Sequence, residues 1–204
     1  MKKTININLA GKPFIIDEDA YQVLEKYLDD INNYFEGNSG EETIIYDIEA
    51  RIAELFEDEL HGTSSIISLV HVKKIQSIMG MPKEFHSGQE ESSHSEQTTE
   101  KRLFRNPDDS MLGGVASGLT AYYGLNTPNI FRALFVFIAF TGVGIVPYIL
   151  LWVFVPKAKT ASDKLAMKGE EINIDSIARY ADESLEEIKE TLNDLGETIK
   201  KKMS

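Results

Sequence analysis

The sequence contains no cysteine among its 204 residues. Disulfides, thiolate nucleophiles and metal sites with cysteine ligands are therefore excluded. The first residues include two lysines but no long apolar run after them, because Asn6 and Asn8 interrupt it. This pattern does not predict a signal peptide, so we expect any membrane targeting to come from an internal segment.

Basic residues are few: the chain has 21 against 33 acidic ones, a net charge of -12. This balance argues against a surface that neutralises phosphates, and we expect no nucleic-acid partner. A short helix over residues 112–123, a glycine turn and a further helix superficially resemble a helix-turn-helix. The further helix runs straight into an apolar segment and carries only Arg132, so direct DNA binding is the weaker interpretation.

The sequence also lacks the motifs of the common enzyme classes, with no HExxH, GxSxG, P-loop or GxGxxG pattern. Its four histidines are scattered, at His61, His71, His86 and His94. The carboxylates over residues 54–59 are better explained as the solvated face of a helix than as a metal site. We therefore expect no enzymatic activity, no catalytic residue, no metal and no cofactor.

Residues 133–155 form a run of 23 without a charged side chain. As a straight helix this run would be about 34 Å long at roughly 1.5 Å per residue. The hydrocarbon core of a bilayer is about 30 Å thick. Because nothing else in the chain is apolar enough to surround such a helix, residues 130–155 are predicted to be a membrane segment with the lipid bilayer as partner.

Features at the ends and middle of this segment agree with membrane insertion. Cations flank it, aromatic side chains lie near its C-terminal end, and glycine and proline interrupt its middle. The residues expected in the segment or at its interfaces are Arg132, Gly142, Gly144, Pro147, Tyr148, Trp152 and Lys157.

Two geometries remain open for the membrane segment. A single span kinked near Gly142 is favoured, since a hairpin of two half-length helices would leave turn backbone groups in lipid. The flanking charges point the other way. Four cations precede the segment and four follow it, and equal flanks are what a hairpin predicts.

The fold class predicted around this segment is mostly α, in four parts. Residues 1–86 form a small α+β domain, with a β-hairpin over 4–16, helices over 17–37, 43–60 and 72–79, and a short strand over 65–69. Residues 87–100 have no large apolar side chain and are predicted to be a flexible linker. Residues 101–158 form a second, helical module. Residues 159–204 are a polar linker followed by an amphipathic helix from Ile174.

The short helix over residues 112–123 is a candidate packing element. Its glycines permit close approach to another helix, and its tyrosines are suited to the headgroup level of a membrane. The candidate residues are Gly113, Gly114, Gly118, Tyr122 and Tyr123. Ordinary packing within the module explains them equally well.

The C-terminal helix carries apolar residues at alternating spacings of four and three. These residues are Ile174, Ala178, Ala181, Leu185, Ile188, Leu192, Leu195 and Ile199. The heptad predicts a coiled coil, through which the chain binds itself or a protein partner, or else a helix packed on the chain's own N-terminal domain. The predicted partner seam comprises Leu185, Ile188, Leu192, Leu195 and Ile199.

Residues 101–158 resemble the PspC domain, named for phage shock protein C. The matching features, in order, are Leu103-Phe104-Arg105, Asp108-Asp109, Leu112-Gly113-Gly114-Val115, Gly118-Leu119, Tyr123-Gly124, Pro128, Arg132, Gly142, Gly144, Tyr148, Trp152 and Pro156. Thr127 stands before the proline, where many members have Asp. Either residue can cap a helix.

The resemblance implies a bacterial inner-membrane protein whose region before the membrane segment is cytoplasmic. It also implies a role in sensing envelope stress or relaying it to transcription through protein partners. We therefore expect a non-enzymatic regulatory or interaction protein. The alternatives are a direct transcriptional regulator and a purely structural anchor or oligomeric membrane subunit.

Overall fold

The computed structural model describes residues 3–60, 66–80, 101–108, 113–125, 127–140, 142 and 144–203. Residues 201–203 are described by their backbone alone. The predicted linker over residues 87–100 lies outside the described residues. The chain divides into two compact units. Unit 1 comprises Met1–Glu91 and Asn173–Ser204, and unit 2 comprises Ser92–Ile172. Helices dominate both, and one small antiparallel sheet lies at the N-terminus, so the predicted fold class is confirmed.

Unit 1 begins with the predicted β-hairpin. Strands β1 (Thr4–Leu9) and β2 (Lys12–Asp17) pair antiparallel, with Ile5 opposite Ile16. Ala10 and Gly11 make the turn with positive φ angles of 47° and 83°. The short strand predicted over residues 65–69 is a single bridge, in which Ile67 donates to the carbonyl of Ile15 at 2.8 Å.

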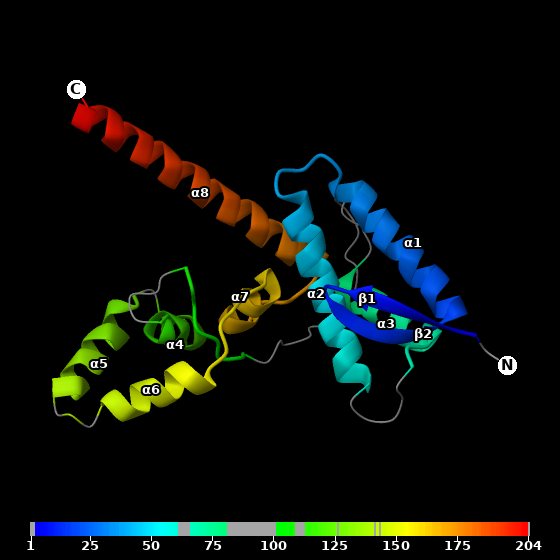
Figure 1. Cartoon of the computed structure of the whole chain (residues 1–204), viewed down its shortest axis with the longest axis horizontal. Coiled ribbons are helices and arrows are strands. Elements are labelled where there is room, and N and C mark those ends of the chain that lie inside the picture. The colour runs from blue at the N-terminus through cyan, green and yellow to red at the C-terminus, as the bar shows by residue number, and fades with distance from the viewer. Residues whose placement is uncertain are drawn as a thin grey trace. The chain divides into compact units, whose positions relative to one another are not determined.

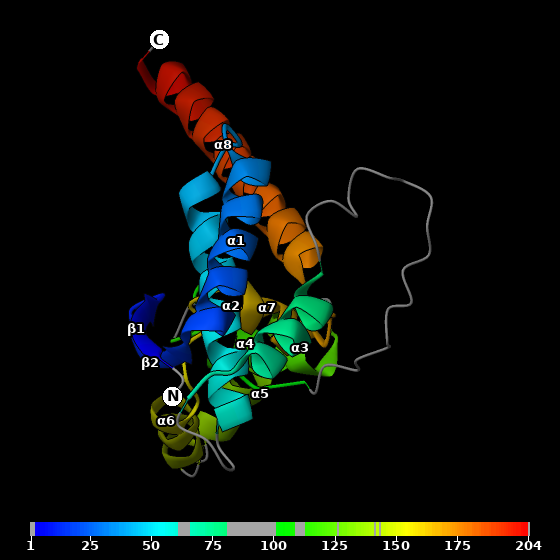
Figure 2. The same ribbon diagram turned by 90° about the vertical axis from the view of Figure 1, so that its right-hand side faces the viewer.

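Helices α1 (Glu18–Phe35) and α2 (Glu41–Leu60) contact this sheet, and α3 (Leu69–Met79) packs on both of them. All three lie close to the predicted bounds. Figure 2 shows α1 and α2 side by side. Each helix turns its apolar stripe inward, and the largest fully buried side chains of the three helices are Leu24, Tyr27, Ile31, Ile44, Ile48, Ile52, Phe56, Ile75 and Met79.

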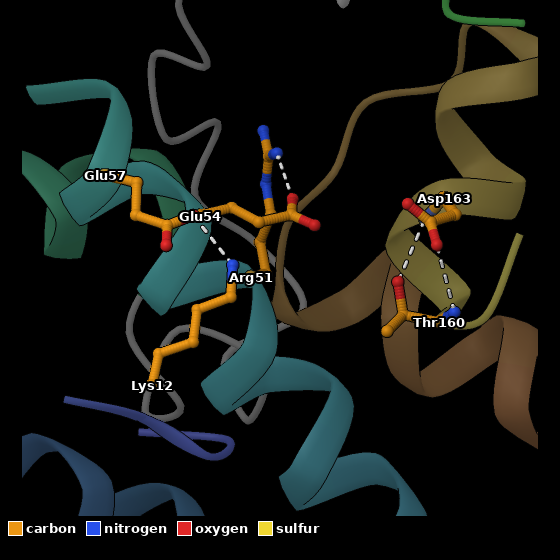
Figure 3. A network of polar contacts seen from close by, with 6 residues as sticks. All are labelled: Lys12, Arg51, Glu54, Glu57, Thr160 and Asp163. Carbon is orange, nitrogen blue, oxygen red and sulfur yellow. Dashed lines mark hydrogen bonds and ion pairs between the residues drawn. The ribbon is translucent and has the colours of Figure 1, made fainter. Parts of the chain in front are cut away.

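The acidic face of α2 has cationic partners. Lys12 Nζ lies 2.7 Å from a carboxylate oxygen of Glu57, and Arg51 Nη1 lies 3.1 Å from one of Glu54 (Figure 3). The first pair joins β2 to α2, and the second lies within α2. These carboxylates therefore belong to the surface of the helix.

The C-terminal helix α8 (Ile174–Met203) belongs to unit 1 and packs on α2. Ile174 and Ile177 have no solvent exposure, and Ala181 is 8% exposed. Asn173 caps the helix, since its Oδ1 accepts from the Ser176 amide at 2.8 Å. The start of α8 thus follows the intramolecular alternative that the heptad left open.

The distal part of α8 differs from its start. Beyond Leu185 its apolar stripe is exposed, with Leu192 at 62% and Ile188 at 55%. Figure 1 shows this part extending past the other elements of unit 1. Ile177, which lies off the predicted heptad, is buried and Ala178 is half-buried, because positions three and four residues after Ile174 both lie on its face of the helix.

Unit 2 contains α4 (Val115–Tyr123), α5 (Asn129–Phe140), α6 (Ile145–Phe154) and α7 (Ala161–Lys168). Helix α4 contacts each of the other three. The described part of the predicted short helix begins at Val115, and Leu112 lies outside the described residues.

Helix α7 corrects the prediction of a polar linker after residue 158. Thr160 and Asp163 form a capping box, in which each side chain accepts from the other residue's backbone amide, at 3.2 and 3.3 Å (Figure 3). Leu165, Ala166 and Met167 are buried. One turn of apolar residues is too short for a periodic signal, which is why the composition of the segment concealed the helix.

We predict that Ile177→Ala lowers the free energy of unfolding by about 2–4 kcal/mol, because it removes a fully buried side chain and leaves a cavity. Ile130→Ala, an identical change at an exposed position of α5, should stay within about 0.5 kcal/mol of the parent in the absence of lipid. Urea denaturation followed by circular dichroism measures both. Equal effects of the two changes would contradict the packing of α8 on unit 1.

Candidate functional site

The most unusual surface of the molecule is an apolar hairpin formed by α5 and α6. Every residue of both helices is described, and none is buried. Figure 1 shows α5 leading away from α4 and α6 returning. Phe137 is 73% exposed, Phe154 77% and Phe140 88%. A soluble monomer rarely exposes so large a contiguous apolar surface, which is typical of an interaction site.

The hairpin corrects the preference for one kinked span. Gly142 adopts a φ of +74° and donates its amide to the Ala139 carbonyl at 2.9 Å, which ends α5. A Cβ on Gly144 would lie 2.5 Å from the Ile138 side chain, so this glycine lets the returning chain pass close to α5. The kink signals were therefore signals of a turn.

Pro147 does not break the apolar segment. It is the third residue of α6, within the first turn, where backbone amides have no intrahelical acceptor. Tyr148 packs edge-on against Phe135 across the hairpin, with ring centroids 5.0 Å apart. Both helices therefore contact each other while their outer faces stay open.

Among the residues the structure describes, no helix combines the length and the apolar character that crossing a bilayer requires.

Arg105 ties the base of the hairpin together. Its Nε donates to the Val155 carbonyl at 2.9 Å, and its guanidinium lies 5.8 Å from the centre of the Trp152 ring. The backbone pairs as well. The Arg105 amide donates to the Pro156 carbonyl at 2.8 Å, and the Ala158 amide donates to the Arg105 carbonyl at 3.0 Å. The segment before the hairpin thus lies beside the segment after it.

Sequence reasoning gave Arg105 no role beyond its basic cluster and the motif that carries the resemblance. Its partners lie about 50 positions along the chain, and no local periodicity reports such a pairing. Trp152, which was expected at a membrane interface, likewise contacts residues that are distant in the sequence. It lies in α6, where it faces both Arg105 and Gly113.

The candidate glycines in α4 and just before it mark close approaches. A Cβ on Gly113 would lie 2.3 Å from Nε1 of Trp152. A Cβ on Gly114 would lie 2.1 Å from the Asn106 carbonyl oxygen, and one on Gly118 would lie 2.1 Å from the Phe104 carbonyl oxygen. Gly113 therefore meets α6, whereas Gly114 and Gly118 meet the extended segment before the hairpin.

The two candidate tyrosines lie at the end of α4. Tyr123 is exposed and stacks on Phe131 of α5, with ring centroids 5.8 Å apart. Tyr122 packs edge-on against Tyr123 at 5.4 Å, and its carbonyl accepts from Lys101 Nζ at 3.4 Å. They connect α4 to the start of α5.

This part of the chain matches a known family. Residues 101–158 match the family model of the PspC domain. The chain carries a PspC domain. No curated protein and no solved structure matches the chain. The domain indicates a phage-shock-type protein related to envelope stress, and PspC domains are generally membrane-associated.

The PspC domain differs in charge from its surroundings. It has five basic and two acidic residues, a net charge of +3. Because the whole chain has a net charge of -12, the residues outside the domain carry a net charge of -15. Three of its cations, Arg105, Arg132 and Lys157, lie at the base of the hairpin. Arg132 is in the first turn of α5 and bonds Asn129 at 3.2 Å, and Lys157 is exposed just after α6. The apolar surface therefore adjoins a positive base.

An apolar cavity of about 260 Å³ lies among α4, α5 and α6 in the PspC domain. Its lining includes Ala116 and Ser117 of α4, Val136 of α5 and Ile149 of α6. The described residues contain no group of three or more His, Asp or Glu side chains that could hold a metal ion. The cavity and the exposed helix faces of this domain are suited to binding apolar ligands or lipid chains.

The predicted partner seam is not one surface. Leu185 is half-buried and lies against Gly40, where a Cβ would come within 2.7 Å of its Cδ1. Ile188, Leu192, Leu195 and Ile199 are all more than half exposed. Only these four residues form an open seam.

We predict that Gly118→Ala lowers the free energy of unfolding by about 1–3 kcal/mol, because the added Cβ overlaps a backbone carbonyl that cannot rotate away. Gly196→Ala is the matched control, since no atom lies within 4 Å of its Cβ position in α8. At position 196 the change should raise the free energy of unfolding by at most about 1 kcal/mol, because alanine has a higher helix propensity than glycine. A neutral Gly118→Ala would show that α4 does not approach residues 104–106 so closely.

Proposed function

We propose that this chain is a regulator bound to the bacterial inner membrane, which acts in the envelope-stress response through protein partners and performs no chemistry itself. The observation that carries the proposal is the hairpin of α5 and α6, with its exposed apolar faces. Lipid is the partner that this surface fits best, because an acyl phase accepts apolar side chains of any shape.

The energetics favour lipid binding. Full burial of one large apolar side chain contributes about 1.5–3 kcal/mol. The more exposed apolar residues of the hairpin are Ile130, Leu134, Val136, Phe137, Phe140, Ile145, Val146, Leu150, Val153 and Phe154. Even partial burial of this set exceeds what holds a peripheral protein on a membrane.

The distribution of charge also supports binding of the membrane through the hairpin. Each Lys or Arg close to an anionic surface contributes about 1 kcal/mol. The positive base of the hairpin is attracted to anionic headgroups, and the acidic remainder of the chain is repelled from them. The PspC domain is then the part that meets the membrane.

The open seam on distal α8 is the proposed partner surface, and its occupant is the same helix of a second copy. Residues 186–190, near the start of the seam, carry three glutamates and one lysine, and residues 197–202, at its end, carry one glutamate and three lysines. An antiparallel pair therefore brings unlike charges together. Such a pair presents two N-terminal domains to further protein partners.

We predict that vesicles of an anionic lipid shift the emission of the chain to the blue. Trp152 is the only tryptophan, so the signal reports on the hairpin alone. The variant Phe137→Asp/Phe140→Asp loses about 2 kcal/mol at each position, and its affinity should fall roughly a thousandfold. Both side chains are exposed, so the fold should be retained.

The matched control for this experiment is Tyr46→Asp/Val70→Asp, which adds the same charge at exposed apolar positions of unit 1. This control should bind vesicles like the parent and co-float with them in a density gradient. A parent chain that neither co-floats nor changes its emission would refute the membrane proposal.

A second prediction concerns the seam. Leu192→Glu should abolish self-association, because it places a charge in the centre of the exposed stripe. Asn193→Glu adds the same charge one residue along, away from the stripe, and should leave the oligomer mass unchanged. Light scattering with the chain in mild detergent measures the mass. An unchanged mass for Leu192→Glu would exclude the paired seam.

A further inference from the structure

Unit 1 is built from two segments that lie on either side of the PspC domain in the sequence. The start of α8 belongs to this unit and packs on α2, and Ile174 and Ile177 have no solvent exposure there. Leu185 extends the contact to the turn at Gly40, before α2. The N-terminal segment and the start of α8 therefore fold as one body.

A folded body occupies one compartment. If residues 130–155 crossed a bilayer, α8 would begin on the side opposite to α1, α2 and α3. Ile174 and Ile177 would then lose the core that buries them. The packing of α8 requires the chain to cross an even number of times or not at all.

The PspC domain supports this conclusion through separate contacts. Arg105 precedes the hairpin and Lys157 follows it, yet the two residues form a parallel backbone bridge. On the two faces of a bilayer they would be separated by about 30 Å of hydrocarbon. Backbone hydrogen bonds of 2.8 and 3.0 Å around Arg105 do not permit that separation.

We propose that the PspC domain binds a single leaflet, with its α5–α6 hairpin entering and leaving the membrane by the same face. Unit 1 and both ends of the hairpin then lie in one compartment. This inference rests on the proposed membrane binding and specifies its geometry. The ligand of the hairpin is one leaflet of a bilayer, and the chain carries no part of itself to the other side.

The lengths of the helices suit one leaflet. Helix α5 has 12 residues and α6 has 10, which gives about 18 and 15 Å at roughly 1.5 Å per residue. Half of the hydrocarbon core is about 15 Å thick. The balanced cations on the two flanks fit as well, because both flanks meet the same layer of headgroups.

The absence of native cysteine allows a direct test. The double variant Lys26→Cys/Asn193→Cys places one thiol on α1 and one on distal α8 away from the seam, both at exposed positions. The full chain is reconstituted from detergent into sealed anionic vesicles and treated with an impermeant maleimide that carries a polyethylene glycol chain. Thiols on the same side give chains with two added polymers or none. Thiols on opposite sides give chains with one.

This readout does not depend on how many chains face inward. The two single variants calibrate the labelling at each site, and solubilised vesicles should give two polymers on every chain. We expect most chains in sealed vesicles to carry either two added polymers or none. A majority with a single polymer would overturn the single-leaflet geometry and leave the membrane proposal intact.

A third variant separates insertion from simple contact with the headgroups. Phe140→Cys, at the exposed end of α5, is labelled with an environment-sensitive fluorophore. Lipids brominated within their acyl chains should quench its emission, whereas the same fluorophore at Lys26→Cys should not be quenched. Absence of quenching at position 140 would overturn insertion into the leaflet. Failure of the chain to co-float with vesicles would refute the proposed function together with this geometry.

Discussion

The contact between Arg105 and residues 155–158 is the constraint on which the rest of unit 2 depends. It closes a loop of about 50 residues with backbone hydrogen bonds, a side-chain hydrogen bond to a carbonyl and a cation–π contact with Trp152. Each of these contributes on the order of 1 kcal/mol. Because the loop is closed at its base, α5 and α6 have to return to their starting point. The glycines of α4 complete the arrangement by letting residues 104–106 approach the helix at backbone distance.

The exposed hairpin and the acidic remainder of the chain work together. An apolar surface of this size promotes aggregation in water unless something covers it. The high negative charge outside the PspC domain opposes such association through mutual repulsion. Under the proposed membrane binding, the positive base of the hairpin favours an anionic membrane over uncharged apolar surfaces. In that proposal charge contributes to selectivity, and apolar area contributes affinity.

Sequence patterns predicted the local elements well and the long-range pairings poorly. The strands of the β-hairpin and the stripes of α1, α2 and α3 follow directly from apolar periodicity, and the C-terminal helix was expected from Ile174 onward. Helix α7 was missed because its apolar turn is short. The turn at Gly142 was read as a kink, since glycine marks both. The link from Arg105 to residues 155–158 depends on chain closure, which no window of sequence contains. At the candidate site, the apolar segment was evident from its composition, whereas only the balanced cations on its two flanks indicated its return on itself.

The division of unit 1 into two segments also fixes the order in which the chain becomes complete during synthesis. Twenty positions separate Phe154, the last residue of α6, from Ile174, the first of α8. At roughly 5–20 residues per second, the hairpin leaves the ribosome about 1–4 s before the start of α8 does. For that interval the N-terminal helices lack the side chains that finish their core. The nascent protein thus presents its apolar hairpin first and completes its N-terminal body second. Under the proposed membrane binding, the hairpin docks on the membrane before unit 1 finishes folding.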